Sequence, residues 1–299
     1  MELLEGRDVP LGRYSVVRRT LPNKVRRTVG AWCFLDHFGP EEVTGKPGMR
    51  VPPHPHIGLQ TVTWLFDGEI RHRDSLGSDV LIRPGELNIM TSGRGIAHSE
   101  DSPTEKPPLL HGVQLWVALP DGARWQEPRF EHLEDLPVAE AAGVRMTVAV
   151  GSLGGVTSPA AVHSELVGAE VRLDAGTPAE IAVDQTYEHG VVVTDGGARV
   201  EGVDVPPGSL LHLPEGRSSL RLASEGGARL FLVGGVPLDE DLVMWWNFVA
   251  RSHEEIVEAR DEWQAGSSRF GVVPGGQEPL PAPALPTTRL LPRPRARAS

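Results

Sequence analysis

Hydrophobic residues in this chain fall in short runs that are separated by glycine and proline. The 299 residues include 34 Gly and 27 Pro, and these lie between runs rich in strand-favouring residues. Short apolar runs bounded by turn residues are typical of β-strands joined by tight turns, whereas helices need longer periodic segments. The pattern therefore predicts an all-β fold rather than a helical one.

The same order of turns and strands occurs twice along the chain. Residues 65–70 are echoed by residues 193–198, and both segments contain an Asp-Gly step that is typical of a hairpin turn. Residues 82–87 are echoed by residues 205–210, and both contain a Pro-Gly step that places a turn before a new strand. The repeat predicts two similar β-barrels or sandwiches in tandem.

A polar connector with a proline separates the two copies at residues 131–137. We therefore expect a first domain over residues 1–135 and a second over residues 136–285. Residues 286–299 combine arginine with proline, a composition that is typical of a disordered tail.

One helix is expected near the C-terminus. Ser252-His253-Glu254-Glu255 is a capping-box pattern that opens a helix, and Gly266 is its expected end. We expect this helix to cover a barrel. The aromatic segment at residues 244–248, just before it, indicates packing more than a binding surface.

Composition narrows the function classes. A net charge of −11 argues against a large basic surface for nucleic acid. Cys33 is the single cysteine, so no internal disulfide can form, a reducing compartment fits, and we expect this side chain in the core. The first residues lack the apolar stretch of a signal peptide, and no run approaches the roughly 20 apolar residues of a membrane span. We therefore expect a soluble cytoplasmic protein.

Two pairs of metal-ligand side chains carry the candidate chemistry: His54 with His56, and His98 with Glu100. Members of each pair are two residues apart, so on a strand both side chains point to the same face. Three imidazoles and one carboxylate suit a first-row transition metal, with iron(II) the leading candidate. Four protein ligands on an ion that prefers six leave room for water, substrate or dioxygen. We therefore expect a binding or catalytic centre rather than a closed structural site.

A pair of histidines two residues apart is more often an ordinary surface feature. The chain contains a comparison of its own, because His163-Ser164-Glu165 repeats the His-Ser-Glu tripeptide without an upstream histidine pair. We interpret this second tripeptide as surface. Context favours the first set, since both of its pairs fall within residues 52–100, which are dense in strand and turn signals.

When the two pairs are moved forward by the offsets that align the turns of the two copies, the corresponding positions in the second copy do not form a ligand set. His189 and His212 lie there, but neither has a ligand partner two residues away, so we interpret them as structural or surface histidines. The second copy is therefore expected to support the metal-binding one. The positions reached by the translation are Ala182, Asp184, Arg221 and Ala223.

Several further side chains lie near the two pairs in sequence. A ligating histidine usually donates its second ring N–H to a carboxylate or carbonyl, which makes nearby acidic residues candidates for that contact. His37 and His72 are expected to pack or to line a pocket rather than to bind metal. Trp64 and Phe66 could provide a flat contact for an aromatic substrate. The candidate carboxylates are Asp36, Asp67, Glu69 and Asp74.

The motifs around these residues resemble the signature of the pirin family, which belongs to the cupin superfamily. The resemblance covers most of residues 10–275 and is strongest from 30 to 120. It rests on VPPHPHIG at 51–58, DGEIRHRDS at 67–75 and GRGIAHSE at 93–100, supported by WCFLDHFGP at 32–40 and WWNFV at 245–249.

The resemblance implies a bicupin fold with iron in the N-terminal cupin. The family's ligands correspond to His54, His56, His98 and Glu100, which all match in residue type. Some relatives are similar to quercetin 2,3-dioxygenases, which open a flavonol ring with dioxygen and release carbon monoxide. Others act as iron-dependent regulators of transcription factors or metabolic enzymes.

The resemblance therefore leads to two expectations of different kinds. In the first, the protein is a dioxygenase that takes a small aromatic substrate such as a flavonol, with Glu100 as the general base. In the second, it is a non-enzymatic iron or redox sensor that binds a protein partner. A structural cupin without a physiological metal is a third interpretation, against which the complete ligand set argues.

Overall fold

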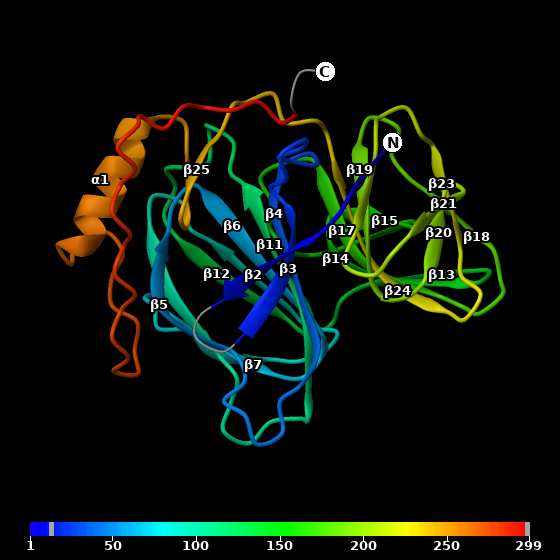
Figure 1. The fold of residues 1–299 in the computed structure, drawn as a ribbon, viewed down its shortest axis with the longest axis horizontal. Coiled ribbons are helices and arrows are strands. Elements are labelled where there is room, and N and C mark those ends of the chain that lie inside the picture. Colours follow the sequence, from blue (N-terminus) through cyan, green and yellow to red (C-terminus); the bar gives the residue numbers. More distant parts are fainter. Residues whose placement is uncertain (12–14, 297–299) are drawn as a thin grey trace. The chain divides into compact units, whose positions relative to one another are not determined.

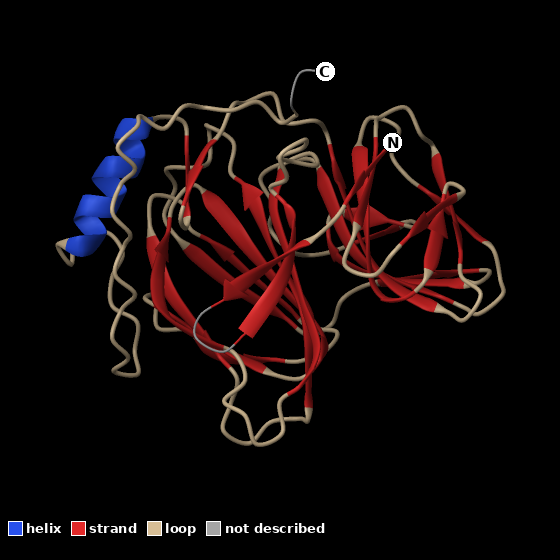
Figure 2. Cartoon of the chain, in the orientation of Figure 1, coloured by secondary structure: helices blue, strands red, loops and turns tan. Residues whose placement is uncertain are grey.

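The computed structural model describes residues 1–11 and 15–296, and strands dominate this part of the chain (Figures 1 and 2). The described residues form two compact units. Among the described residues, the first unit comprises residues 9–11, 15–17, 38–132 and 239–296, and the second comprises residues 1–8, 18–37 and 133–238. This architecture confirms the predicted all-β fold. The proposed boundary at residue 135 stays a prediction.

The first unit is built around one seven-stranded and one four-stranded antiparallel sheet. The seven-stranded sheet has the order β12 (Arg129–Leu133), β9 (Leu87–Thr91), β6 (Leu59–Asp67), β11 (Leu109–Ala118), β4 (Trp32–Glu42), β3 (Ser15–Leu21) and β2 (Arg7–Leu11). Residues of β2, β3 and β4 belong partly to each unit. The four-stranded sheet has the order β5 (Arg50–His56), β10 (Ile96–Asp101), β7 (Ile70–Asp74) and β8 (Asp79–Ile82).

The second unit contains two sheets of the same sizes and a short hairpin. Its seven-stranded sheet has the order β1 (Glu2–Leu4), β22 (Leu210–Leu213), β19 (Glu188–Gly196), β24 (Ala228–Gly235), β17 (Leu166–Leu173), β14 (Val144–Val150) and β13 (Val138–Ala141). The four-stranded sheet has the order β18 (Ala179–Ala182), β23 (Ser219–Ala223), β20 (Ala198–Val200) and β21 (Val203–Val205). The hairpin is β15 (Ser152–Leu153) with β16 (Val156–Thr157).

The internal repeat is visible in the connectivity of the two units. The order β5-β10-β7-β8 in the first unit matches β18-β23-β20-β21 in the second, strand for strand along the chain. Asp67-Gly68 joins β6 to β7, and Asp195-Gly196 lies at the corresponding turn between β19 and β20. The predicted tandem arrangement of two similar β-structures is confirmed.

Each unit has its own hydrophobic core. The core of the second unit is made of branched aliphatic residues from both of its sheets, including Val191, Leu211 and Leu220. The first unit has one cluster around Phe38 and Leu65 and another that joins its sheet to the C-terminal segment. Burial of these side chains supplies most of the driving force for folding. Cys33 is buried, as expected.

The C-terminal segment of the first unit forms a hairpin and a helix. Strands β25 (Val243–Trp245) and β26 (Phe248–Ala250) pair antiparallel, and α1 (His253–Gln264) follows. The Ser252 side chain accepts a hydrogen bond from the Glu255 backbone N–H, which confirms the predicted N-cap. Glu255 differs from a full capping box, because its carboxylate accepts from the Arg251 backbone N–H at 3.1 Å rather than from that of Ser252.

The apolar face of α1 covers one side of the first unit. Ile256 and Ala259 are buried there, in the same cluster as Phe248 and Phe270. The aromatic residues of the hairpin pack as predicted: Trp246 and Phe248 meet edge to face with ring centroids 5.4 Å apart. Arg293, beyond the helix, exchanges backbone hydrogen bonds of 3.2 and 3.0 Å with Leu242, which precedes β25. Residues 297–299 of the predicted tail lie outside the described residues.

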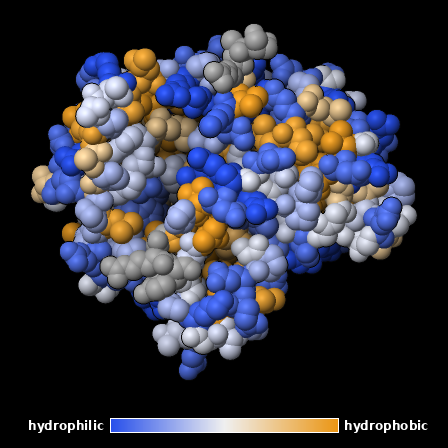
Figure 3. Space-filling model, viewed as in Figure 1, coloured by the Kyte–Doolittle hydropathy of each residue, from blue (hydrophilic) through white to orange (hydrophobic). Residues whose placement is uncertain are grey.

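The surface is mixed in character. On the face drawn in Figure 3, hydrophobic residues occur in several separate patches among hydrophilic ones. Among the described residues, no helix has the length and apolar character that a bilayer-crossing segment needs.

Candidate metal centre

The two predicted ligand pairs lie on neighbouring strands of the first unit. His54 and His56 are on β5, and His98 and Glu100 are on β10, which pairs antiparallel with β5. The register places His98 opposite His54, and it shifts between His98 and Glu100. Because residues two apart on a strand share a face, the pairing brings both sets of side chains to the same side of the sheet.

Three imidazoles converge at this point. Ligand nitrogens of His54, His56 and His98 lie within 4.8 Å of one another, and all three side chains are buried. Nε2 of His56 is 3.0 Å from Nε2 of His98, and the ring centroids of His54 and His98 are 4.4 Å apart. A separation of this size allows both nitrogens to reach one cation at a bond length of about 2.1 Å.

The outer nitrogens of two histidines are held by backbone carbonyls. Nδ1 of His54 is 3.0 Å from the Pro52 oxygen, and Nδ1 of His56 is 2.9 Å from the Asn247 oxygen. A carbonyl oxygen can only accept, so each Nδ1 carries the hydrogen and each Nε2 keeps a free electron pair. Histidine ligands of metals are oriented in this way.

Burial keeps the three imidazoles neutral. Desolvation lowers the pKa of His54 to about 4. It also lowers the pKa of His56 and of His98 well below the ordinary value, with a further contribution from His54. A neutral imidazole is the form that binds metal, so the electrostatics of the site match the donor set.

Glu100 belongs to a second, overlapping group. Its carboxylate lies within 4.8 Å of ligand nitrogens of His72 and His98, so His98 is common to both groups. The Thr63 hydroxyl is 3.2 Å from Oε1 of Glu100 and 2.9 Å from Oε1 of Gln114. Burial raises the pKa of Glu100, which is only partly offset by His72 and by the contact with Thr63. The structure thus places the four predicted ligands in two overlapping groups that share His98.

The side chains of His72 and Asp74 on β7 also belong to this neighbourhood. Nδ1 of His72 is 3.4 Å from Nδ1 of His98, and its Nε2 is 3.1 Å from Oδ2 of Asp74. His72 stacks on Phe130 with ring centroids 4.3 Å apart. These two residues form a third pair spaced two apart, which is the sequence signal that could have assigned them.

The other candidate carboxylates have different surroundings. Asp36 accepts two hydrogen bonds from Arg19, at 2.7 and 2.8 Å, and Glu69 accepts from Arg83 at 3.1 Å. His163-Ser164-Glu165 lies in a bend before β17, with Glu165 exposed. That tripeptide is outside a strand, as its interpretation as surface implied.

Aromatic side chains surround the histidines. The ring of Trp116 meets that of His56 edge to face, with centroids 5.1 Å apart. Trp64 and Phe66 are buried in β6, and Phe66 packs against His111. The sequence interpretation did not identify Trp116, Thr63 or Asn247, although Thr63 lies only seven residues after His56.

The second unit presents a different interior. The inward-facing residues of β18 and β23 are apolar and belong to the core: Ala179, Ile181, Leu220 and Leu222. Among the translated positions in this unit, Ala182, Asp184 and Arg221 are exposed instead, and Ala223 is half-buried. The translation is therefore off by one residue, and a shift of one residue exchanges the two faces of a strand.

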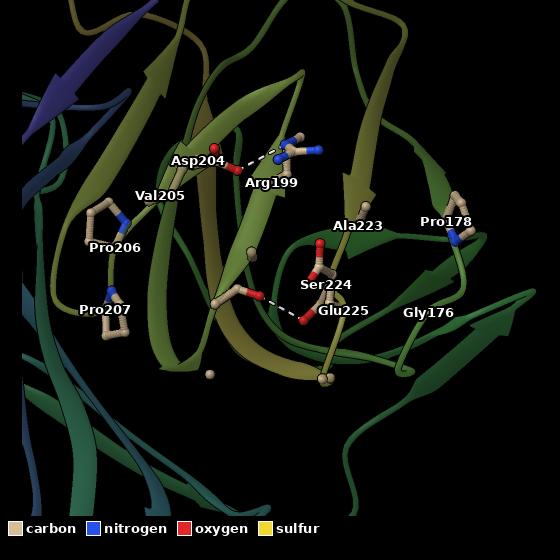
Figure 4. Close-up of a pocket in the computed structure, with 15 residues that line it drawn as sticks. Gly176, Pro178, Arg199, Asp204, Val205, Pro206, Pro207, Ala223, Ser224 and Glu225 are labelled. Atoms are coloured by element: carbon tan, nitrogen blue, oxygen red, sulfur yellow. Dashed lines mark hydrogen bonds and ion pairs between the residues drawn. The ribbon is translucent and has the colours of Figure 1, made fainter.

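A cavity of about 680 Å³ lies in the second unit (Figure 4). It is lined by turn residues, among them Pro206 and Pro207, and by an ion pair in which Arg199 Nε is 2.8 Å from Asp204 Oδ1. None of the lining residues is a histidine. This cavity is separate from the ligand set of the first unit.

The donor set fits a transition metal. Three neutral imidazoles, two of which have electron pairs directed inward, form with the neighbouring carboxylate the nitrogen-rich combination that divalent iron, nickel, copper or zinc accepts. The fold and this site define a protein with two cupin domains and a histidine-rich centre in one of them.

Comparison with known proteins identifies the family. Residues 14–117 match the model of the Pirin family, and residues 168–271 match that of the Pirin C-terminal cupin domain. The chain therefore belongs to the pirin family, as the motifs suggested.

Individual relatives cover nearly the whole chain. A Pseudomonas aeruginosa protein named "Putative quercetin 2,3-dioxygenase" is 42% identical over 96% of this chain and 91% of the relative. A "Pirin-like protein" of Caulobacter vibrioides is 35% identical over 93% of this chain and 98% of the relative. The crystal structure of a quercetin 2,3-dioxygenase from Acinetobacter baumannii has a TM-score of 0.93, with 41% identity over 96% of each chain.

Proposed function

We propose that the protein is a metal-dependent dioxygenase that opens the ring of a flavonol with dioxygen and releases carbon monoxide. The observation that carries this proposal is the convergence of three buried, neutral imidazoles, two of which have their outer nitrogens held by carbonyls. Relatives that are named as quercetin 2,3-dioxygenases support the choice of reaction and substrate class.

His54, His56, His98 and Glu100 would hold the metal, with Fe²⁺ as the expected ion. A bound divalent cation would act as a Lewis acid and lower the pKa of a flavonol hydroxyl. The histidines would stay neutral throughout, because burial opposes their protonation. The reducing compartment that the single cysteine suits would be the cytoplasm.

Glu100 is proposed as the general base. Burial raises the pKa of this carboxyl, which increases its ability to take a proton. A proton from the substrate's hydroxyl would be accepted on Oε1, the oxygen that lies near the Thr63 hydroxyl. The Trp116 ring next to His56 offers an aromatic surface close to the ligands. Its position supports an aromatic substrate.

A first experiment tests the reaction directly. The protein is reconstituted anaerobically with Fe²⁺, and quercetin and dioxygen are then added while flavonol absorbance and carbon monoxide are followed. Loss of the flavonol band together with carbon monoxide release is the expected result. His56→Ala, which removes one ligand, should be inactive, and His163→Ala should behave as the wild type.

The alternative function uses the same ligands. An iron-dependent regulator that binds a protein partner would bind Fe²⁺ tightly and stoichiometrically without consuming quercetin. That outcome would reject the quercetin reaction while retaining the metal centre.

A further inference from the structure

We infer that His72 and Asp74 are positioning residues that fix the tautomer of the ligand His98. This inference rests on the proposed metal centre and adds a chain of hydrogen bonds behind it. The chain runs from the Asp74 carboxylate through both ring nitrogens of His72 to Nδ1 of His98.

His98 differs from the other two histidines in its outer contact. Nδ1 of His54 and of His56 each meets a carbonyl oxygen, which accepts a hydrogen. Nδ1 of His98 instead meets Nδ1 of His72, which can either accept or donate. The backbone alone therefore does not determine which nitrogen of His98 carries its hydrogen.

Asp74 resolves this ambiguity. Its carboxylate can only accept, so Nε2 of His72 must carry a hydrogen toward Oδ2. A neutral His72 then has an electron pair on Nδ1, which accepts the hydrogen of His98 Nδ1. Nε2 of His98 is left with an electron pair directed toward Nε2 of His56, 3.0 Å away, where a cation would be held.

The two residues are themselves firmly placed. His72 and Asp74 are 2% and 0% exposed, and His72 is stacked on Phe130. Oδ1 of Asp74 accepts from the backbone N–H groups of Leu76 at 2.9 Å and Ser78 at 3.0 Å. The carboxylate is thus fixed by the turn that follows β7, with Oδ2 directed at the histidine.

Asp74→Asn is the decisive variant. The amide oxygen can keep both backbone hydrogen bonds, so the turn is retained, but an NH₂ group then faces Nε2 of His72. His72 would have to move its hydrogen to Nδ1, which opposes the hydrogen on Nδ1 of His98. His98 would then favour the tautomer with hydrogen on Nε2, which cannot bind metal.

The test measures metal affinity by chelator competition, with Zn²⁺ and with Fe²⁺ under anaerobic conditions. Asp74→Asn should weaken binding about 10- to 100-fold, the range for loss of a contact that orients a ligand. Asp79→Asn is the matched control, because Asp79 lies in the same hairpin but its carboxylate pairs with Arg71 instead of His72. The control should bind within about twofold of the wild type. Equal affinity in Asp74→Asn and the wild type would overturn the inference.

A second pair of variants separates orientation from packing. His72→Gln keeps an acceptor for His98 and a donor for Asp74, whereas His72→Leu keeps only the volume. His72→Gln should recover much of the affinity that His72→Leu loses. Equal losses in the two variants would count against the inference, even if Asp74→Asn failed to fold.

Nitrogen NMR of the imidazoles in the zinc-loaded protein reads the tautomer itself. Hydrogen on Nδ1 of His98 is expected in the wild type, and hydrogen on Nε2 of a zinc-loaded His98 would contradict the inference. Failure of the proposed function would give a different result. If the wild-type protein bound neither Zn²⁺ nor Fe²⁺, the proposed metal centre itself would be rejected.

Discussion

The two units of this protein share a strand order in their four-stranded sheets, but the side chains that these sheets direct inward differ in chemical character. In the first unit, β5 and β10 direct imidazoles and a carboxylate inward. In the second, the corresponding strands direct Ile181, Leu220 and Leu222 into a core of aliphatic side chains. The comparison shows that the same strand order can enclose either chemistry, and that each interior needs its own supporting contacts.

Those supporting contacts differ between the units. In the first unit, carbonyls and a neighbouring histidine meet the outer nitrogens of the candidate ligands. In the second unit, His189 is fully buried, and neither of its ring nitrogens has a hydrogen-bond partner among the described residues. His212 instead meets the Glu188 carboxylate at 2.9 Å. Buried histidines therefore occur in both units, but among the described residues those of the first unit alone belong to a group of three or more metal-ligand side chains.

The largest effect is expected from a substitution that destroys the candidate metal centre in the first unit and leaves the second unit intact. His56→Ala should reduce the affinity for Fe²⁺ at least 100-fold and abolish turnover, because a ligand and its link to Asn247 are both lost. His189→Leu should leave the iron content unchanged, since His189 belongs to the second unit. Iron per chain after desalting measures both. Loss of iron in His189→Leu would break the comparison.

Glu100→Gln should separate chemistry from binding within the first unit. The amide keeps the size of the side chain but cannot take a proton, so turnover should fall about 10²- to 10⁴-fold. Metal binding by the three histidines should be partly retained. Single-turnover flavonol consumption, compared at equal iron content, measures the effect. Wild-type turnover at equal iron content would remove Glu100 from the role of base.

The sequence predicted the fold, and it singled out the side chains that lie close together at the candidate centre, because both depend on short-range patterns. Turn steps such as Asp67-Gly68 and Pro84-Gly85 are local, and a spacing of two fixes which side chains share a strand face. The contact of His56 with Asn247 joins residues 191 positions apart. Local patterns cannot predict such a contact.

The failure of the repeat translation has an equally physical reason. The offset that aligns the Pro-Gly turns is one residue too long for the strands β10 and β23, so the exposed Arg221 was matched to His98 while the neighbouring Leu220 faces the core. A slip of one residue exchanges the faces of a strand. The spacing of His72 and Asp74 is visible in the sequence, but their position next to His98 depends on β10 lying between β5 and β7, which no local pattern predicts.

The second unit should lose stability in acid because of His189. Desolvation lowers the pKa of this imidazole to about 4, from an ordinary value of 6.5. The unfolded chain therefore binds a proton below pH 6.5 while the folded unit does not, so the free energy of unfolding falls between pH 6.5 and 4. The total loss should be about 3 kcal/mol, because each tenfold difference in proton affinity between the folded and unfolded states corresponds to about 1.4 kcal/mol.

His189→Leu should remove that part of the pH dependence. Urea unfolding of the metal-free protein at pH 7 and pH 4.5 measures it, with the variant compared against the wild type. The buried histidines of the first unit titrate in the same direction, so the difference between the two proteins isolates the second unit. An identical pH dependence in both proteins would show that His189 is not the source.

The smallest effect concerns how the C-terminal hairpin reaches the candidate ligands. Gly58 has a φ of +68°, and a Cβ added there would lie 2.1 Å from the Val249 oxygen. Val249 in turn donates its N–H to the Ile57 carbonyl at 3.2 Å, two residues from Asn247. Gly58→Ala should therefore lower the free energy of unfolding by about 2 kcal/mol and move the Asn247 carbonyl away from His56.

Gly45→Ala is the matched control, because Gly45 also has a positive φ but open space where a Cβ would be added. It should cost only about 1 kcal/mol and leave metal affinity unchanged, so a weaker affinity in Gly58→Ala alone would link the hairpin to the centre. Equal affinities in the two variants would instead show that the first unit holds His56 without this contact.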